Sequence, residues 1–523
     1  MSWRAGGALR VGRNRRNDDG LDGNTAIGDR RAGGQDTSAA AHRLTRRQLI
    51  AAGGLAATAF ALRSSGRPPV YGVDALFVDA ASVPTFYSRP DLQIPALSVA
   101  PGSQGSGSGL ILLAPYGVPG KQAGPVIVDP RGELVWEQPL AQPLIGTDFR
   151  VQTFMGRPAL TWFEGRVEFG HGVGSYVIAD AAYTPLARVN AGNGQHGDLH
   201  EFLLTDRDTA LLTTYRIVTR DLRAVGGSAK GTIQDAMFQE IDLASGKLLM
   251  EWHSLDHIAL DESYFIPINA KNWDYVHLNS IAVDTDQNLL VSARNTHAIY
   301  KLDRSSGEII WRLGGKRSTF AIEPAATFGW QHDARRQLDG TITMFDNGET
   351  VSRALVLNVD ESHRRATLRH AYVHPANLYA ISQGSVQVLP NGNIFIGWGS
   401  QPYVSEFTAS GELVFDARLG APHYISYRAY QLPWSGEGSG APAIATRSSA
   451  THTDAFVSWN GDTRVARWTA LAGTSAADLA PLASVVRTGF ETLIRVPRRF
   501  THLRVQGTDA SGKLLATGPV VTI

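Results

Sequence analysis

The stretch HLNSIAVDTDQNLLVSARNTHAIYKLDRSSGEIIWRLGG, residues 277–315, contains two β-hairpin patterns in succession. In each one, apolar and polar residues alternate before and after a short polar turn, DTDQN in the first and DRSSG in the second. Alternation with a period of two is typical of strands, and Asp, Asn, Ser and Gly favour turns. Two hairpins make a four-stranded unit of about 40 residues, which is the size of one blade of a β-propeller.

Both hairpin patterns recur along the chain, and they alternate. The second pattern recurs in GPVIVDPRGELVWEQ, AMFQEIDLASGKLLMEWHS and PYVSEFTASGELVFDARL, and the first in LHEFLLTDRDTALLTTYR, QHDARRQLDGTITMFDNG and GSVQVLPNGNIFIGWGS. This alternation predicts an all-β fold in which residues 110–422 form a six-bladed β-propeller, with Trp136 and Trp311 packed between blades. Unrelated hairpins in a β-sandwich or a β-helix are the alternative.

The chain beyond residue 422 has a different pattern. The Gly- and Ser-rich junction SGEGSGAPAIA is followed by short alternating segments, among them DAFVSWNGDTRVARWTALAG and THLRVQGTDASGKLLATGP. Residues 423–523 are therefore predicted to form a C-terminal β-sandwich of the fibronectin type III or immunoglobulin-like kind, with Trp459 and Trp468 in its core. A surface position that binds carbohydrate is the alternative for these two tryptophans.

The first 66 residues form a basic leader, and residues 67–109 connect it to the predicted propeller. Residues 1–49 carry a net charge of +5, which leaves −4 for the rest of the chain. Arg46 and Arg47 precede the apolar run Leu49–Leu62, which is shorter than the roughly 20 residues of a membrane span. This arrangement resembles a twin-arginine export signal. We expect the twin-arginine translocation machinery to export the chain to the periplasm, the cell envelope or the medium; a lone buried or interfacial helix is the alternative.

The composition excludes several functions. Charged side chains nearly balance, with 49 Lys and Arg against 48 Asp and Glu, so the chain as a whole has no preference for nucleic acid. The absence of cysteine excludes disulfide bonds, thiolate metal sites and cysteine nucleophiles. Hydrophobic residues make up 43% of the chain, enough for a sizeable core, and 54 glycines agree with a turn-rich β fold.

Three histidines occupy the same position in different repeats. His200, His277 and His332 each stand where the first strand of a hairpin begins. In a propeller the innermost strands begin near the central axis, so these side chains are predicted to converge on one opening. The second strand of each hairpin returns to the same end, which is expected to bring Arg294 and Arg216 to this opening as well.

The other histidines of the repeats differ in position. His171, in EFGHGVGSYVIAD, precedes a further predicted strand and is a candidate for the same opening, with a turn-stabilising role as the alternative. Asp333 follows His332 directly, and strand alternation predicts that its carboxylate is exposed on the opposite face. Five histidines lack the common position and are assigned no role: His253, His257, His297, His370 and His374.

Imidazoles and guanidiniums at one opening predict an electropositive pocket. Such a pocket suits a tetrahedral oxyanion, because arginine offers a planar fork of donors and histidine offers directional ones. A zinc ion bound by three histidines is the alternative. The neighbouring Arg294 would repel a cation, which favours the anion and predicts a site without metal.

The segments DYVHLNSIAVD, SARNTHAIYKLD, GEIIWRLGG and WQHD together resemble the arylsulfotransferase family, in particular the bacterial enzymes that move a sulfuryl group without a nucleotide donor. The resemblance covers most of residues 110–419, and TFYSRPDL and ILLAPYG resemble the start of the same family. Its most specific feature is the order His, His-x-Asn, Arg, His. The chain departs from the family in lacking cysteines near the site, in a shorter Arg294 to His332 interval, and in a sandwich at the C terminus rather than the N terminus.

The resemblance implies an active site in the central channel. His332 is the implied nucleophile, which would carry the sulfuryl group as a sulfohistidine. His277, Asn279 and Arg294 are implied to hold the sulfate oxygens, and His200 is implied to bind sulfate or to exchange a proton with the phenol. The candidate catalytic residues are thus His332, His200, His277 and Arg294, and the candidate substrate-binding residues are Asn279, Arg216 and His171.

These observations predict an exported aryl sulfotransferase that passes a sulfuryl group from an aryl sulfate to a phenol, with no cofactor and with ping-pong kinetics. Fixed cationic donors can stabilise the loose transition state of such a transfer. One alternative is a binding or scaffold propeller with an anion-binding channel, whose C-terminal sandwich contacts a partner or the cell envelope. Another is a quinoprotein dehydrogenase, because GEIIWRLGG resembles the tryptophan-bearing turns of pyrroloquinoline quinone propellers.

Overall fold

The computed structural model describes residues 84–93, 95, 97–103, 109–119, 121–267, 271–420, 424–497 and 499–523. The leader with its twin-arginine pattern lies outside the described residues, as does part of the 67–109 segment. Strands dominate the described chain, so the prediction of an all-β fold is confirmed. No helix in these ranges is both long and apolar enough to cross a membrane. The helical elements are short, namely α2 (Ser254–His257), η2 (Arg223–Val225), η3 (Leu260–Glu262) and η4 (Pro324–Ala326).

Most strands belong to six antiparallel sheets, each with a core of four strands. In five of the sheets the strands pair in chain order, as successive hairpins do: β5 to β8, β9 to β12, β14 to β17, β19 to β22, and β23 to β26. In the sixth, the late strand β27 pairs with β2, which continues to β3 and β4.

The bounds of these strands in chain order are β2 (Leu110–Tyr116), β3 (Val126–Val128), β4 (Leu134–Glu137), β5 (Ile145–Phe154), β6 (Arg157–Glu168), β7 (His171–Ala179), β8 (Pro185–Val189), β9 (Phe202–Leu204), β10 (Thr209–Arg220), β11 (Gly231–Asp242), β12 (Leu248–His253), β14 (Leu278–Val283), β15 (Leu289–Ala293), β16 (Ala298–Leu302), β17 (Ile309–Gly314), β19 (His332–Arg336), β20 (Ile342–Asp346), β21 (Arg353–Asp360), β22 (Arg365–Val373), β23 (Ser385–Val388), β24 (Ile394–Gly397), β25 (Tyr403–Phe407), β26 (Leu413–Leu419) and β27 (Ile425–Leu432). Three short strands extend the sheets, namely β1 (Leu97–Val99) beside β26, β13 (Trp273–Asp274) beside β11, and β18 (Ala321–Ile322) beside β22.

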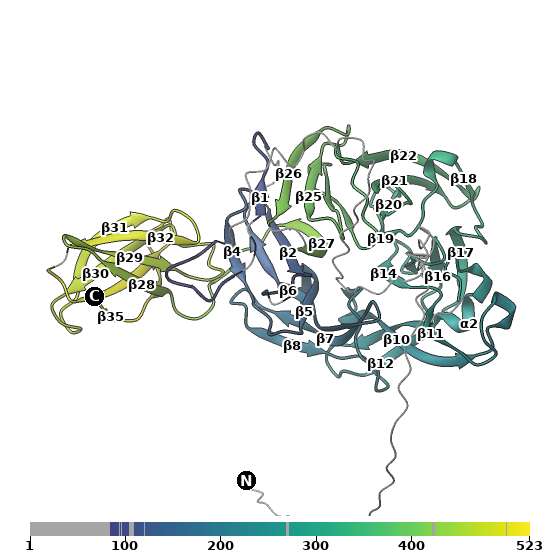
Figure 1. Cartoon of the computed structure of the whole chain (residues 1–523), viewed down its shortest axis with the longest axis horizontal. Helices are drawn as coiled ribbons and strands as arrows, with labels where there is room; N and C mark the ends of the chain where they lie inside the picture. Colours follow the sequence, from purple (N-terminus) through teal and green to yellow (C-terminus); the bar gives the residue numbers. More distant parts are fainter. Residues whose placement is uncertain are drawn as a thin grey trace, which may run out of the picture. The chain divides into compact units, whose positions relative to one another are not determined.

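The six sheets contact one another in a closed order (Figure 1). Strand β27 contacts β5, β5 contacts β9, β10 contacts β14, β14 contacts β19, β19 contacts β23, and β23 returns to β27. The first strand of each sheet therefore faces the middle of the ring, where residues far apart in the sequence meet.

Apolar layers fill the spaces between neighbouring sheets. Trp136 on β4 packs against Phe149 and Trp162 of the next sheet, and its ring stacks on Tyr183 with centroids 4.6 Å apart. Trp311 on β17 lies in an equivalent layer with β20 and β21. Both tryptophans are only 1% exposed, which agrees with the expected packing between sheets.

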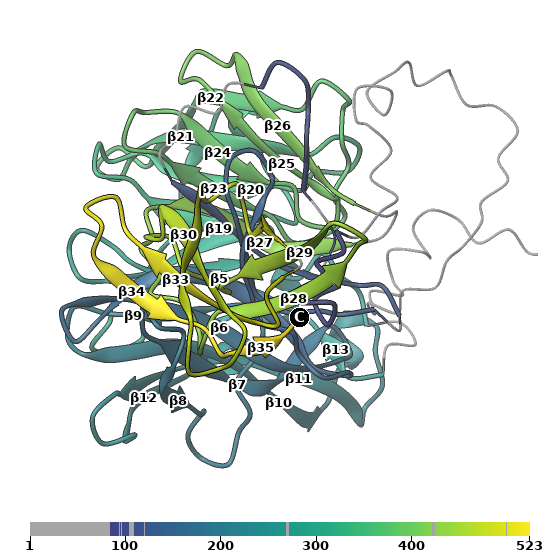
Figure 2. The same cartoon turned by 90° about the vertical axis from the view of Figure 1, so that its left-hand side faces the viewer.

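The last strands form two sheets that share one apolar core (Figure 2). Trp459 and Trp468 both belong to this core and are 7% and 2% exposed, as expected. One sheet consists of β28 (Ala443–Ser448), β29 (His452–Ser458) and β32 (Glu491–Pro497), and the other of β30 (Arg467–Gly473), β31 (Ala480–Val486), β33 (His502–Thr508), β34 (Leu514–Thr517) and β35 (Val521–Thr522).

The predicted boundary at residue 423 differs from the sheet arrangement. Strand β27 lies beyond that boundary, yet it pairs with β2 along most of its length rather than with β28 to β35. This pairing joins segments about three hundred residues apart, and a local hydrophobic pattern does not carry such information. The two C-terminal sheets begin only at β28.

Candidate active site

The inner strands begin with bulges, and these bulges aim side chains into the middle of the ring. The β5–β6, β14–β15 and β19–β20 ladders each shift register near the start of the inner strand. Asp148 and Asp333 lie at two of these shifts with φ angles of 51° and 56°, and His277, with a φ of 57°, directly precedes β14. A bulge breaks the two-residue alternation and redirects a side chain, and positive φ in non-glycine residues often marks a functional site.

Three histidines meet at the starts of these strands. The ring centroids of His200 and His277 are 4.6 Å apart, and the ring of His171 lies 5.0 Å from His277 and 5.7 Å from His200. His171 and His200 are buried, and His277 has a side-chain exposure of 15%. The structure therefore brings together His200 and His277, two of the three histidines that share the common position in the repeats, and the further candidate His171.

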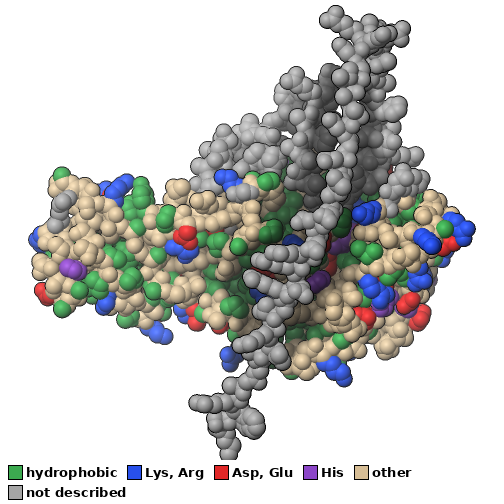
Figure 3. Space-filling model, turned by 60° about the horizontal axis from the view of Figure 1, so that its bottom comes forward, with side chains coloured by type: hydrophobic (Ala, Val, Ile, Leu, Met, Phe, Trp, Pro, Cys, Tyr) green, Lys and Arg blue, Asp and Glu red, His purple; other side chains and the backbone are tan. Residues whose placement is uncertain are grey.

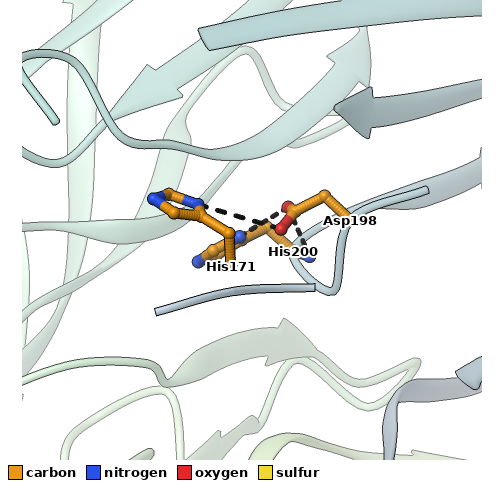
Figure 4. Close-up of side chains that lie close together, drawn as sticks. All are labelled: His171, Asp198 and His200. Carbon is orange, nitrogen blue, oxygen red and sulfur yellow. Dashed lines mark hydrogen bonds and ion pairs between the residues drawn. The ribbon is translucent and has the colours of Figure 1, made fainter. Parts of the chain in front are cut away.

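Two aspartates that the sequence prediction did not include fix these rings. Asp198 Oδ2 lies 2.6 Å from His200 Nδ1 (Figure 4). Its Oδ1 accepts a hydrogen bond from Gly172 N. Asp274 binds His277 Nδ1 in the same way and lies 3.2 Å from His171 Nε2. Because each carboxylate accepts the Nδ1 proton, His200 and His277 retain a lone pair on Nε2 when neutral. The sequence contains a sign of these pairs, because Asp198 stands two residues before His200 and Asp274 stands three residues before His277.

The protonation states of the cluster differ from ring to ring. Burial opposes a charge on His171, but the charges of Asp274 and Asp198 outweigh it and raise the pKa of His171. Burial lowers the pKa of His277 to about 4, although Asp274 acts in the opposite direction. Burial also opposes ionisation of the two aspartates, yet the neighbouring histidines lower both carboxyl pKa values well below the usual range. The raised pKa favours the protonated form of His171, which suits it as the proton donor of the cluster, whereas His277 is neutral at neutral pH.

His332 lies near this cluster and is held on both ring nitrogens. Nδ1 donates to Asn347 Oδ1 at 2.7 Å, and Nε2 accepts a hydrogen bond of 3.2 Å from Gln383 N. The rings of His332 and His200 lie 6.4 Å and 5.5 Å from that of Tyr427. Burial, followed by the charge of Arg294, lowers the pKa of His332 well below its usual value. His332 is therefore a neutral imidazole with its lone pair on Nε2.

Arg294 returns beside His277 as predicted, since Arg294 N donates to His277 O. Its guanidinium donates to Asn295 Oδ1 and Ile381 O and lies 4.7 Å from the centre of the Trp330 ring. Burial lowers the pKa of Arg294 to about 10, so the group is charged at neutral pH. Arg294 Nε is buried and has no hydrogen-bond partner among the described residues, so this N–H is free to bind an anion.

Asn279 is fully buried beneath the cluster. Its Nδ2 donates to Gln331 O at 2.7 Å, whereas Oδ1 has no hydrogen-bond partner in the described chain. The amide donor thus positions the backbone next to His332, and the unpartnered Oδ1 can accept a hydrogen bond from a ligand.

The structure does not bring Arg216 to the cluster. Strand β10 alternates, so Tyr215 faces His171, with ring centroids 3.8 Å apart, and Arg216 points to the other face. Arg216 is half-exposed there and forms an ion pair of 3.0 Å with Asp235. The spacing between His200 and Arg216 predicted the correct end of the strand, but the Arg216 side chain lies on the face away from the histidine cluster.

A buried ionic network adjoins the cluster. Glu201 follows His200 and forms ion pairs with Arg335 at 2.5 Å and with Arg428 at 3.2 Å. The predicted exposure of Asp333 is wrong: this residue is 1% exposed and pairs with Arg335, because the bulge turns it inward. The network contains three carboxylates and three guanidiniums, namely Asp148, Glu201, Asp333, Arg150, Arg335 and Arg428. Its opposite charges balance.

The pocket is less electropositive than the sequence predicted, because Asp198 and Asp274 offset His171 and Arg294. Histidine and acidic side chains lie beside one another on the face shown in Figure 3. The groups His171–Asp198–His200 and His171–Asp274–His277 have potential metal ligands within 4.8 Å of one another. Asp–His hydrogen bonds already use Nδ1 of His200 and of His277, whereas both ring nitrogens of His171 are buried without a hydrogen-bond partner among the described residues.

The ring of sheets and the histidines at its centre define an all-β protein with a buried acid–base site. The chain belongs to the arylsulfotransferase (ASST) family, whose model matches residues 150–420. The recognition of this family from sequence is thereby confirmed.

Solved structures with a similar fold have little sequence in common with this chain. A protein of unknown function from Bacteroides caccae is 13% identical, with a TM-score of 0.38, and covers 62% of this chain and 98% of its own. A Lactobacillus plantarum protein is 15% identical, with a TM-score of 0.35, and covers 74% and 99%. Virginiamycin B lyase from Staphylococcus aureus is 12% identical, with a TM-score of 0.27, and covers 63% and 87%. No curated protein matches the chain. We draw no functional conclusion from these low scores.

Proposed function

We propose that the protein transfers a sulfuryl group from an aryl sulfate to a phenol through a sulfohistidine at His332. The observation that carries the proposal is the meeting of neutral His332, the His171–His200–His277 cluster and the charged Arg294 at the middle of one ring of sheets. Membership of the arylsulfotransferase family supports the same reaction class.

In the first half-reaction, His332 Nε2 attacks the sulfur atom of the donor. The bond between sulfur and the aryl oxygen breaks, and the aryl oxide leaves with the electron pair. Arg294 Nε, which has no hydrogen-bond partner among the described residues, and Asn279 Nδ2 hold sulfate oxygens, because donors fixed in a dry site stabilise charge in the transition state. The Nδ1 proton stays on the His332 ring and remains hydrogen-bonded to Asn347 Oδ1.

In the second half-reaction, the acceptor phenol attacks the sulfur atom and the N–S bond breaks, returning the electron pair to His332 Nε2. His200 takes the phenol proton on Nε2, as a carboxylate-bound imidazole does in hydrolases. His171 supplies a proton to the departing donor oxide. Asp198 lies 2.6 Å from His200 Nδ1 and 3.9 Å from His171 Nδ1 and stays ionised, so that it stabilises the protonated form of either ring. Between turnovers His200 releases the proton on Nε2 to solvent and His171 regains one from solvent, which balances the cycle.

The finer architecture and the location are part of the same proposal. The closed ring of six sheets is a six-bladed β-propeller, and strands β28 to β35 form a fibronectin type III-like sandwich. The twin-arginine pattern near Arg46 supports export to the cell envelope or beyond.

Release of a coloured phenol from an aryl sulfate tests the proposal. Purified protein is incubated with 4-nitrophenyl sulfate, with and without an acceptor phenol, and compared with His332→Ala. Acceptor-dependent release that is lost in the variant is expected. Unchanged release by His332→Ala would sink the assignment of the nucleophile.

A second candidate function is a channel that binds anions without transferring them. The observation in its favour is the Gln383 N–H on His332 Nε2, because that hydrogen bond must break before Nε2 can attack. Binding of aryl sulfates by titration calorimetry, without turnover across a panel of acceptors, would favour this function.

A further inference from the structure

A cavity of about 440 Å³ lies beside the histidine site, with Trp330, Phe328 and His297 among its walls. The rings of His297 and Trp330 meet edge to face with centroids 4.3 Å apart. Tyr264 stacks on His297 at 4.1 Å and supports it. Together these residues form an aromatic wall next to the reaction site.

The aromatic wall is uncharged and is held in place by packing. Burial, assisted by the charges of Arg294 and Lys316, lowers the pKa of His297 to about 3, so its ring is uncharged at neutral pH. Gly329 leaves room for this ring, since a Cβ atom at Gly329 would lie 3.1 Å from His297 Nδ1. Trp330 has a φ of 59°, which is a strained backbone conformation for a bulky residue. Such a conformation persists only where the surrounding structure holds the residue, and it is frequent at functional sites.

Trp330 and Arg294 connect the cavity to the site of transfer. Trp330 O lies 3.1 Å from His332 Nδ1, and the guanidinium of Arg294 lies over the Trp330 ring. The charge of Arg294 lowers the pKa of both His297 and His332. Trp330 thus lines the cavity and also contacts Arg294, so an aromatic ligand packed on Trp330 lies one side chain away from the charged guanidinium.

The cavity wall carries three charged side chains, of which Asp346 and Arg353 pair with each other, whereas the exposed Glu349 forms no ion pair among the described residues. Asp346 accepts hydrogen bonds from Gly329 N and Gly348 N and forms an ion pair of 2.9 Å with Arg353. This pairing reduces the repulsion that the carboxylate would exert on an anionic ligand.

We propose that this cavity binds the ring system of the aryl group and that it selects ring systems larger than a single benzene ring. A protein cavity of about 150 Å³ holds benzene. The cavity here is roughly three times that volume, within the range of pockets that enclose whole organic ligands. The inference rests on the proposed sulfuryl transfer and identifies the class of its substrate as sulfates of phenols with two or three fused rings.

Narrowing the cavity tests this inference. Val351, which lines the cavity, is changed to Phe, and the matched control Val486→Phe lies on exposed strand β31 of the C-terminal part. We measure kcat/KM with 4-nitrophenyl sulfate and with 4-methylumbelliferyl sulfate, which has two fused rings. Wild type should prefer the two-ring donor, and Val351→Phe should lower its kcat/KM about tenfold while changing the one-ring value less than about twofold.

Calorimetric titration with the same two sulfates separates this inference from the proposed function. If wild type binds the two-ring sulfate more tightly and Val351→Phe removes that preference, the inference holds even without turnover. If Phe328→Leu also weakens binding of the two-ring sulfate, the wall is further supported. Equal binding of both sulfates by wild type, or a preference unchanged in Val351→Phe, would overturn the inference even if transfer occurs.

Discussion

The change Asp274→Asn should disable the histidine cluster while keeping the size of the side chain. The carboxylate accepts the Nδ1 proton of His277 and lies 3.2 Å from His171 Nε2. An amide accepts more weakly and carries no charge, so His277 loses its fixed tautomer and the pKa of His171 falls. A hydrogen bond to a charged acceptor contributes about 1.5–3 kcal/mol. If the transition state loses this amount, the transfer rate falls ~10- to 150-fold.

The assay measures release of 4-nitrophenol in the presence of a phenol acceptor, with single-turnover experiments for each half-reaction. Asp256→Asn, on the exposed face of α2, is the matched control and should retain wild-type rates. The pH profile should also change, because His171 would lose its proton at a lower pH in the Asp274→Asn variant. Wild-type kcat and an unchanged pH profile in this variant would refute the role of the Asp274 pairs.

Three further predictions follow from the same contacts. Arg294→Lys should lower kcat/KM about a hundredfold, because an ammonium cannot replace a planar guanidinium donor, as initial rates would show; an unchanged rate would exclude Arg294 from sulfate binding. Transfer should persist below pH 6 and fall as the pH drops through about 4, where His277 gains a proton and its charge, 4.6 Å from the His200 ring, opposes uptake of the phenol proton by His200; loss near pH 6.5 would contradict this. Glu201→Gln should reduce the free energy of unfolding by about 3–5 kcal/mol, because it leaves the three buried guanidiniums of the network with only two carboxylates, as denaturant melts would show; a smaller effect than about 1 kcal/mol would count against the network.

The repeat pattern predicted the strands because each hairpin is local. Alternation and turn residues around residues 277–315 correspond to β14 to β17, with the polar turns where they were expected. The return of β27 to β2 was not predictable, since it depends on a pairing between distant segments. Local patterns specify hairpins, whereas ring closure depends on contacts across the whole chain.

The common position of the histidines predicted part of the site for the same reason. His200 and His277 lie at equivalent strand starts, and the structure places them 4.6 Å apart. The predicted exposure of Asp333 and the predicted place of Arg216 at the opening were both wrong. A bulge overrides alternation at Asp333, whereas regular alternation on β10 turns Arg216 away from the cluster.

The place of His297 could not be predicted from the position of histidines in the repeats. It lacks the common position of the other histidines, yet its ring forms part of the aromatic wall beside Trp330. Its place depends on packing against Tyr264, which is distant enough in sequence that no periodic pattern links the two.

The most direct test of the sulfohistidine is to trap it. Wild-type protein is mixed with an aryl sulfate in the absence of acceptor, quenched at high pH and digested, and the peptides are examined by mass spectrometry. The account predicts one added sulfuryl group on the peptide that contains His332, which disappears when a phenol is added before the quench. A sulfuryl group on His200 or His277 instead, or acceptor-dependent turnover without any modified histidine, would contradict it.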